Sequence, residues 1–167
     1  MKNYNYLKLL ALLVVALLLS AVSCKTATKV SDEYAGYGGY NTECLGIDPD
    51  GTQRLRTWGQ GANKAQAMEQ AKRKAVETVI FNGITNGVQG CNKRPLVNEV
   101  NAREKYEDYF NAFFRDGGAY NLYVRLDEKR TSRIKSQNSA QEAFGVIVSV
   151  DRSALRKRLI DDNVIDN

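Results

Sequence analysis

The residues of this chain whose types could carry chemistry are its three cysteines, because the 167-residue sequence contains no histidine. Without histidine, Ser–His and Cys–His nucleophile systems and the usual zinc sites are excluded. Cys44 and Cys91 lie far apart and have no second cysteine pair beside them, so a four-cysteine metal site is excluded as well. The chemistry that remains is modification of Cys24 and disulfide formation by the other two cysteines.

The residues before Cys24 have the pattern of a secretory signal. Lys2 and Lys8 give a positive start, residues 9–19 form an uncharged apolar run, and small residues then lead into the cysteine. The run is too short for a stable membrane anchor and has the length of a signal-peptide core. The segment that ends in Cys24 resembles the bacterial lipobox, although Ala21 stands where leucine is commonest.

The lipobox resemblance implies that residues 1–23 are removed as a lipoprotein signal peptide and that the Cys24 thiol carries diacylglycerol. It also implies a fatty acid such as palmitate on the new amino terminus, and two or more acyl chains anchor a protein stably to a membrane. The alternative is an ordinary secreted protein cleaved near Ser23. Lys25 replaces the aspartate of the best-known inner-membrane retention signal, which favours the outer membrane, facing the periplasm.

Export would place Cys44 and Cys91 in an oxidising compartment, where an even number of remaining cysteines predicts a disulfide bond. Two free buried thiols are the alternative. The formal net charge is +5, and it falls by two when Lys2 and Lys8 are removed. Such a mild charge does not indicate nucleic acid as a partner.

Residues 24–41 are expected to form a flexible, lipid-bearing tether, since they are polar, rich in glycine and without core periodicity. Tyr34, Tyr37 and Tyr40 lie among these glycines and offer an alternative role, stacking on the sugar rings of peptidoglycan. A single folded domain is expected over residues 42–167.

The first elements of that domain have clear local signals. Residues 48–51, Asp-Pro-Asp-Gly, are a turn signal between two short strands, which predicts a hairpin. Asn63 is the predicted N-cap of a helix, and Gln66 stands three residues later, as in a capping box. Gly83 marks the expected C-terminal end of this helix. The apolar positions of this helix that recur at helical spacing are Ala65, Met68, Ala71, Ala75, Val76, Val79 and Ile80.

A loop over residues 83–97 holds Cys91, and a second helix is predicted over residues 98–115. This second helix carries an aromatic stripe, which consists of Tyr106, Tyr109, Phe110, Phe113 and Phe114. Such a stripe usually belongs to the core, and any exposed part of it would be the candidate partner-binding surface.

The last part of the chain predicts two strands and a helix. Residues 120–126 and 144–150 are the expected strands, and the basic segment 129–141 is expected to be a mobile hairpin loop between them. Asp151 is the expected cap of a final helix that turns its arginines and Lys157 outward. The order β-β-α-α-β-β-α favours an α+β domain, with a mainly antiparallel sheet of about four strands and helices on one face.

A strand that ends in Trp58-Gly59-Gln60-Gly61 leads into an alanine-ladder helix, and the later strand at 146–150 leads through Asp151 into Ala154-Leu155-Arg156-Lys157-Arg158-Leu159. This arrangement resembles the N-terminal domain of flagellar assembly protein T and related small outer-membrane lipoproteins. The resemblance implies a non-enzymatic envelope module that docks onto other proteins, and it implies no catalytic residues. The segment with Cys91 and the aromatic helix has no counterpart in that pattern.

Two other groups of residues suggest an enzymatic or a ligand-binding function instead. Gly59-Gln60-Gly61 before a helix N-terminus could cradle an anion, or it could simply be the tight turn that lets the helix meet the strand. Glu104, Glu107 and Asp108 could serve a glycosidase, which needs only two carboxylates, or could form surface ion pairs.

The sequence therefore predicts a non-enzymatic, lipid-anchored envelope protein that needs no cofactor or metal. Its partners are expected to be the membrane, through the lipid on Cys24, and another envelope protein that it binds as an interaction or assembly module. A peptidoglycan- or glycan-binding lipoprotein is the alternative, followed by a small hydrolase.

Overall fold

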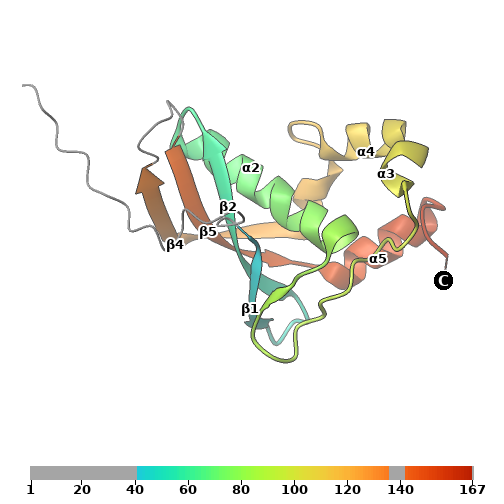
Figure 1. The fold of residues 1–167 in the computed structure, drawn as a ribbon, viewed down its shortest axis with the longest axis horizontal. Helices are drawn as coiled ribbons and strands as arrows, with labels where there is room; N and C mark the ends of the chain where they lie inside the picture. The colour runs from blue at the N-terminus through green and yellow to red at the C-terminus, as the bar shows by residue number, and fades with distance from the viewer. Residues whose placement is uncertain (1–40, 136–141, 167) are drawn as a thin grey trace, which may run out of the picture.

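The computed structural model describes residues 41–135 and 142–166, and only the backbone of residues 128–135 and 142. The described chain has an α+β fold, in which a five-stranded mixed sheet has the strand order β3-β1-β2-β5-β4. The helices lie against one side of this sheet (Figure 1). The predicted signal peptide, Cys24 and all but the last residue of the predicted tether lie outside the described residues.

The predicted first hairpin is present. Strands β1 (Glu43–Ile47) and β2 (Gln53–Gly61) pair antiparallel, with an irregular register between Cys44 and Gly46. The connecting turn is closed by a hydrogen bond from the Asp48 amide to the Thr52 carbonyl, at 2.9 Å. Gly51 has a φ of +83°, which a glycine adopts without steric cost.

Helix α2 (Lys64–Glu77) begins at the predicted cap, where the Asn63 side chain accepts a hydrogen bond from the Gln66 amide. The helix continues into a π-helical turn, η2 (Thr78–Asn82), and ends at Gly83, whose φ is +71°. This ending confirms the predicted glycine C-cap.

The alanine ladder of α2 contacts the sheet, but one of its predicted members does not. Ala67, Ala71 and Ala75 are fully buried, whereas Ala65 is exposed, so the prediction that Ala65 faces the core is wrong. Two residues along an α-helix correspond to a rotation of about 200°. Ala65 therefore points away from the side on which Ala67 meets β2.

The loop after α2 is attached to the sheet at two points. Residues Asn86–Gly87 form a short strand, β3, which pairs parallel with β1 and adds a fifth strand that the sequence did not predict. Nearby, the predicted disulfide joins Cys44 to Cys91, with a sequence separation of 47 residues. Closing a loop of this length contributes ~4 kcal/mol to stability in the chain-entropy model.

The predicted second helix is shorter than expected and broken in two. It consists of α3 (Ala102–Lys105) and α4 (Glu107–Phe114), which are separated at Tyr106. Asn101 has a φ of +62°, a left-handed conformation that cannot continue a right-handed helix in the N-terminal direction. The predicted helical start at residue 98 is therefore wrong.

The region between α4 and the last helix also differs from the prediction. Residues Ala119–Tyr123 form a 3-10 turn, η3, and strand β4 begins only at Val124 and runs to Lys135. Tyr120 is fully buried, because this turn directs its ring into the core.

The basic segment predicted as a loop from residue 129 instead belongs to β4 as far as Lys135. This strand pairs with β5 (Glu142–Val150), with an irregular register between Asp127 and Thr131. Backbone pairing with a neighbouring strand overrides the polar character of a segment, because the ladder uses main-chain groups. The remainder of the predicted loop, 136–141, lies outside the described residues.

The last helix, α5 (Arg152–Asp161), begins as predicted, with the Asp151 side chain accepting a hydrogen bond from the Ala154 amide at 2.8 Å. Leu155 and Leu159 are buried, which attaches the helix to the core. The core itself lies between the sheet and the helices, and it includes Leu55, Val146 and Val148 from the central strands β2 and β5.

Candidate functional site

The predicted aromatic stripe belongs mostly to the core. Phe110, Phe113 and Phe114 are 2%, 3% and 6% exposed, so these three residues do not form the partner surface that an exposed stripe would have offered. Tyr106 and Tyr109 are half-buried. The helix buries this stripe because its phenylalanines stack on one another and on neighbouring rings, with Phe110 and Phe81 edge to face at a centroid distance of 4.6 Å.

Tyr109 links the aromatic helix to α5. Its hydroxyl donates a hydrogen bond to Asp162 at 2.7 Å, and Asp162 also forms an ion pair with Arg158 at 2.6 Å. Burial, followed by the hydrogen bond to Asp162, raises the pKa of the Tyr109 hydroxyl. The hydroxyl therefore stays protonated at neutral pH and acts as a donor that positions α5.

The carboxylates considered for a glycosidase do not converge on a cleft. Glu104, Glu107 and Asp108 are all exposed, and none of them lines the groove beside α5 that is described below. Within the described residues, no group of three or more cysteine or carboxylate side chains is placed to hold a metal ion.

The Gly59-Gln60-Gly61 segment is explained by close packing. A Cβ atom built on Gly59 would lie 1.9 Å from the Ala67 carbonyl oxygen, and one on Gly61 would lie 2.7 Å from the Ala67 amide nitrogen. Both glycines therefore allow β2 to approach the backbone of α2.

Backbone amides that could bind a phosphate at this turn already donate hydrogen bonds to side chains of α2 and of its cap residue. The Gln60 amide donates to the Gln70 side chain, the Ala62 amide to Gln66 Oε1 at 3.1 Å, and the Gln66 amide to Asn63 Oδ1 at 3.0 Å. This occupancy favours the tight-turn interpretation over the anion cradle.

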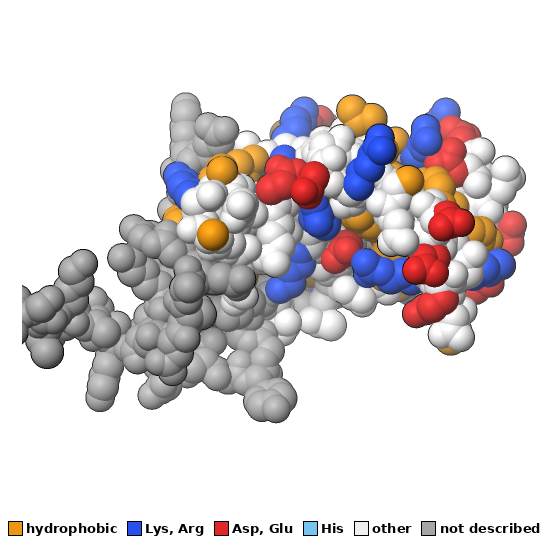
Figure 2. Space-filling model, turned by 90° about the horizontal axis from the view of Figure 1, so that it is seen from above, with side chains coloured by type: hydrophobic (Ala, Val, Ile, Leu, Met, Phe, Trp, Pro, Cys, Tyr) orange, Lys and Arg blue, Asp and Glu red, His pale blue; other side chains and the backbone are white. Residues whose placement is uncertain are grey.

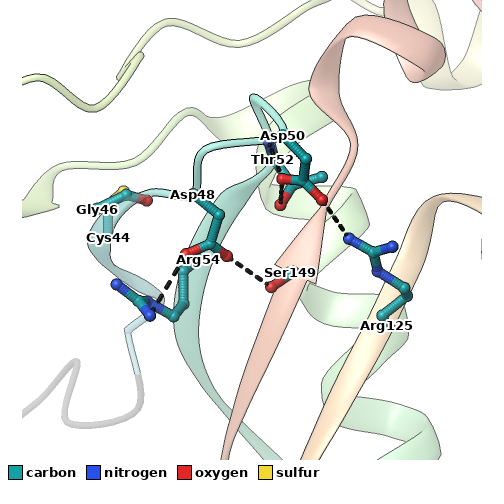
Figure 3. Close-up of polar contacts among 8 residues, drawn as sticks. All are labelled: Cys44, Gly46, Asp48, Asp50, Thr52, Arg54, Arg125 and Ser149. Atoms are coloured by element: carbon teal, nitrogen blue, oxygen red, sulfur yellow. Dashed lines mark hydrogen bonds and ion pairs between the residues drawn. The ribbon is translucent and has the colours of Figure 1, made fainter.

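A polar cluster surrounds the β1–β2 turn (Figure 3). Asp48 accepts a hydrogen bond from the Ser149 hydroxyl at 3.1 Å and pairs with Arg54 at 3.3 Å. Asp50 pairs with Arg125 at 2.7 Å. Ser149 donates its proton to a carboxylate that an arginine already holds, so the cluster fastens the turn to β5 and β4 and does not activate a nucleophile.

A second polar network joins α2 to the 3-10 turn η3. Glu69 accepts hydrogen bonds from Tyr120 and Asn121 and pairs with Lys72 at 2.6 Å. The Arg73 guanidinium lies 5.6 Å from the centre of the Tyr120 ring. These contacts join two elements and stabilise the position of η3 on α2, although Arg73 Nε is buried without a hydrogen-bond partner.

A groove of about 730 Å³ lies beside α5. We call it the α5 groove. Its walls come from the loop after β3, the junction of α3 and α4, and the two ends of α5. The α5 groove is lined by Asn92, Arg94, Pro95, Leu96, Val97, Asn98, Glu99, Lys105, Tyr106, Arg152, Arg156, Asn163, Val164, Ile165 and Asp166. Figure 1 places these elements on the side of the molecule that holds the C-terminus.

The loop wall of the α5 groove is held in place by the main chain. The Leu96 and Val97 amides donate to the carbonyl groups of Val79 and Ile80, at 3.0 Å and 2.9 Å. The Gln53 side chain, which is 2% exposed, donates to the Asn92 carbonyl at 3.0 Å. Together with the Cys44–Cys91 disulfide, these contacts make the wall a defined part of the fold.

Arg152 and Arg156 stand one helical turn apart on α5, so both reach the same groove. Arg152 Nη2 donates to the Arg94 carbonyl at 2.7 Å, while its Nη1 is buried and has no hydrogen-bond partner. Burial lowers the pKa of the Arg152 guanidinium, which nevertheless remains charged at neutral pH.

Several cations of the domain form ion pairs. Arg73 pairs with Asp116 at 2.5 Å, Arg103 with Glu77 at 3.1 Å, and Lys105 with Glu99 at 2.7 Å. Figure 2 shows basic and acidic side chains interspersed over the face seen from above.

Arg94, Arg152 and Arg156, in contrast, form no ion pair with any carboxylate in the described part of the chain. These three arginines are therefore the cations left available for an external anion at the α5 groove.

Sequence reasoning missed this site because it assigned Arg152 and Arg156 to the solvent face of a helix. One signal was available: Lys157 and Arg158 each have an aspartate four residues later, whereas Arg152 is followed at that spacing by Arg156. A helix cation without a carboxylate at this spacing lacks its usual intrahelical partner.

In comparisons with protein-family models, curated proteins and solved structures, nothing matches this chain. The resemblance to the flagellar assembly protein T domain therefore remains a prediction. In the described ranges 41–135 and 142–166, no helix is long and apolar enough to cross a membrane.

Proposed function

We propose that this protein is a non-enzymatic, lipid-anchored envelope protein that acts as an interaction or assembly module. The observation that carries the proposal is the α5 groove, which combines partly accessible apolar side chains with three arginines that form no ion pair with a described carboxylate. The lipobox-like sequence before Cys24 supports attachment to the envelope, where the groove would dock another envelope protein.

The apolar part of the groove supports a protein partner. Leu96 and Ile165 are half-buried and Val97 and Val164 are 4% exposed, so the groove offers partly accessible apolar surface between polar walls. Protein interfaces combine such a floor with a polar rim and with arginine. The arginines of the networks around the β1–β2 turn and η3, in contrast, each form an ion pair with an aspartate: Arg54 with Asp48, Arg125 with Asp50 and Arg73 with Asp116.

Photocrosslinking in the native envelope tests the proposal. A photoreactive residue replaces Asn98, an exposed groove residue, or Lys64, an exposed residue at the start of α2, in the full-length lipidated protein. We expect one discrete protein adduct from position 98 and none of the same mass from position 64. Equal adducts from both positions, or no protein adduct from position 98, would contradict the proposal.

A further inference from the structure

We infer that the α5 groove recognises an acidic segment of its partner protein, and that a carboxylate of this segment pairs with Arg152. This inference rests on the proposed function and specifies the chemistry of the partner. Its starting point is Arg152 Nη1, which is buried without a hydrogen-bond partner in a wall of an open groove. A buried donor without an acceptor is destabilising, and a movement of the Arg152 side chain that brings this donor to a partner carboxylate would remove that cost.

The charge balance of the groove favours an anionic partner. Its lining holds four cations, Arg94, Lys105, Arg152 and Arg156, against two carboxylates, Glu99 and Asp166. Glu99 is already paired with Lys105 at 2.7 Å, and Asp166 forms no ion pair with a described cation. Three arginines therefore face the groove with their charge uncompensated by a close carboxylate.

The geometry favours a carboxylate on a peptide over a membrane surface. A guanidinium has planar, forked donors that match a carboxylate, and Arg152 uses only Nη2 internally, in its bond to the Arg94 carbonyl. The groove also offers the half-buried side chains of Leu96 and Ile165, which an apolar side chain of a peptide could contact. An acidic residue next to an apolar residue would satisfy both parts of the groove.

The position-98 crosslink provides the test, now with variants of the arginines in the full-length lipidated protein. We expect the crosslinked partner segment, once sequenced, to contain Asp, Glu or a C-terminal carboxylate. Arg152→Gln should reduce the adduct at least about tenfold, since it removes a charge-assisted pair, and Arg156→Gln should also reduce it. Arg152→Lys, which keeps the charge but not the fork, should fall between wild type and Arg152→Gln.

Arg115→Gln is the matched control, because Arg115 is an exposed arginine outside the groove, and its adduct yield should equal that of the wild type. Thermal unfolding of each variant shows whether the fold is retained, and Arg156 is exposed, so its replacement leaves the core intact.

A wild-type adduct yield in both Arg152→Gln and Arg156→Gln, a crosslinked segment without a carboxylate, or a lipid adduct would overturn the inference. A protein adduct that is insensitive to the arginines leaves the proposed function standing, whereas the absence of any protein adduct removes both.

Discussion

At the scale of single residues, Asp50 shows how one exposed carboxylate organises a turn. The Thr52 hydroxyl and amide donate to Asp50 Oδ1 at 2.7 Å and 3.0 Å, and Arg125 pairs with its other oxygen. The hydrogen bonds from Thr52, followed by Arg125, lower the pKa of Asp50 from 3.8 to about 2. The turn is therefore held by the ionised form of this side chain.

The depressed pKa predicts a specific dependence of stability on pH. A carboxylate with a lowered folded-state pKa stabilises the fold above its unfolded pKa, and this contribution is lost as the pH falls through about 2. Asp50→Asn should therefore lower the melting temperature at pH 7, and the difference from wild type should shrink between pH 4 and pH 2.

Thr52→Val removes the hydroxyl that donates to Asp50 and keeps the amide donor. The difference in melting temperature between this variant and wild type should also shrink between pH 4 and pH 2, by a smaller amount than for Asp50→Asn. A melting-temperature difference for Asp50→Asn that is the same at pH 2 and pH 7 would show that the ionised carboxylate contributes nothing at the turn.

At the scale of elements, the contact between β2 and α2 depends on the absence of a side chain at Gly59. The nearest atoms to a Cβ at this position are the Ala67 carbonyl oxygen at 1.9 Å and the Ala71 amide nitrogen at 2.6 Å. Both atoms belong to the helix backbone and cannot swing aside as a flexible side chain could. The small residues Ala67 and Ala71 on the helix complete this close approach.

Gly59→Ala should therefore destabilise the protein by about 1–3 kcal/mol, because the added methyl group forces strand and helix apart. Urea unfolding measures this loss. The neighbouring Gln60→Ala changes an exposed side chain and should stay within about 0.5 kcal/mol of wild type. Equal stability of Gly59→Ala and wild type would mean that the helix does not lie this close to the strand.

At the scale of the whole molecule, the described domain carries a groove whose three arginines form no ion pair with a described carboxylate. The disulfide attaches the loop wall of this groove to β1, and main-chain hydrogen bonds attach it to η2. The predicted lipid on Cys24 would attach the same molecule to a membrane. An anchored domain with a preformed groove is suited to hold a partner at that membrane.

Intact-mass spectrometry of protein extracted from membranes tests the anchor. We expect a mass that lacks residues 1–23 and includes diacylglycerol and an acyl chain on Cys24. Cys24→Ser should lose both the lipid mass and the membrane association, whereas Cys91→Ser should lose the disulfide and keep the lipid. An unmodified mature terminus in the wild type would contradict lipid anchoring.

Two kinds of feature could be predicted from the sequence alone. The first are set by contacts within a few residues, and the second is the pairing of the two cysteines that remain once Cys24 is set aside. The turn at residues 48–51 and the caps at Asn63 and Asp151 were predictable, because each is set by hydrogen bonds and backbone angles within a few residues. The Cys44–Cys91 pairing was expected from the predicted export and the predicted lipid on Cys24, and the structure contains this disulfide.

Only the tertiary structure decided which surfaces are buried and which distant groups meet. The burial of Phe110, the exposure of Ala65 and the extension of β4 to Lys135 all depend on neighbours from other elements. The α5 groove brings Arg94 to Arg152 across a sequence separation of 58 residues, through a loop whose path is set by contacts with η2 and β1. Local propensities act over a few residues, so they do not predict that Arg94 and Arg152 lie side by side. Their contact arises only when the long-range contacts of the loop form.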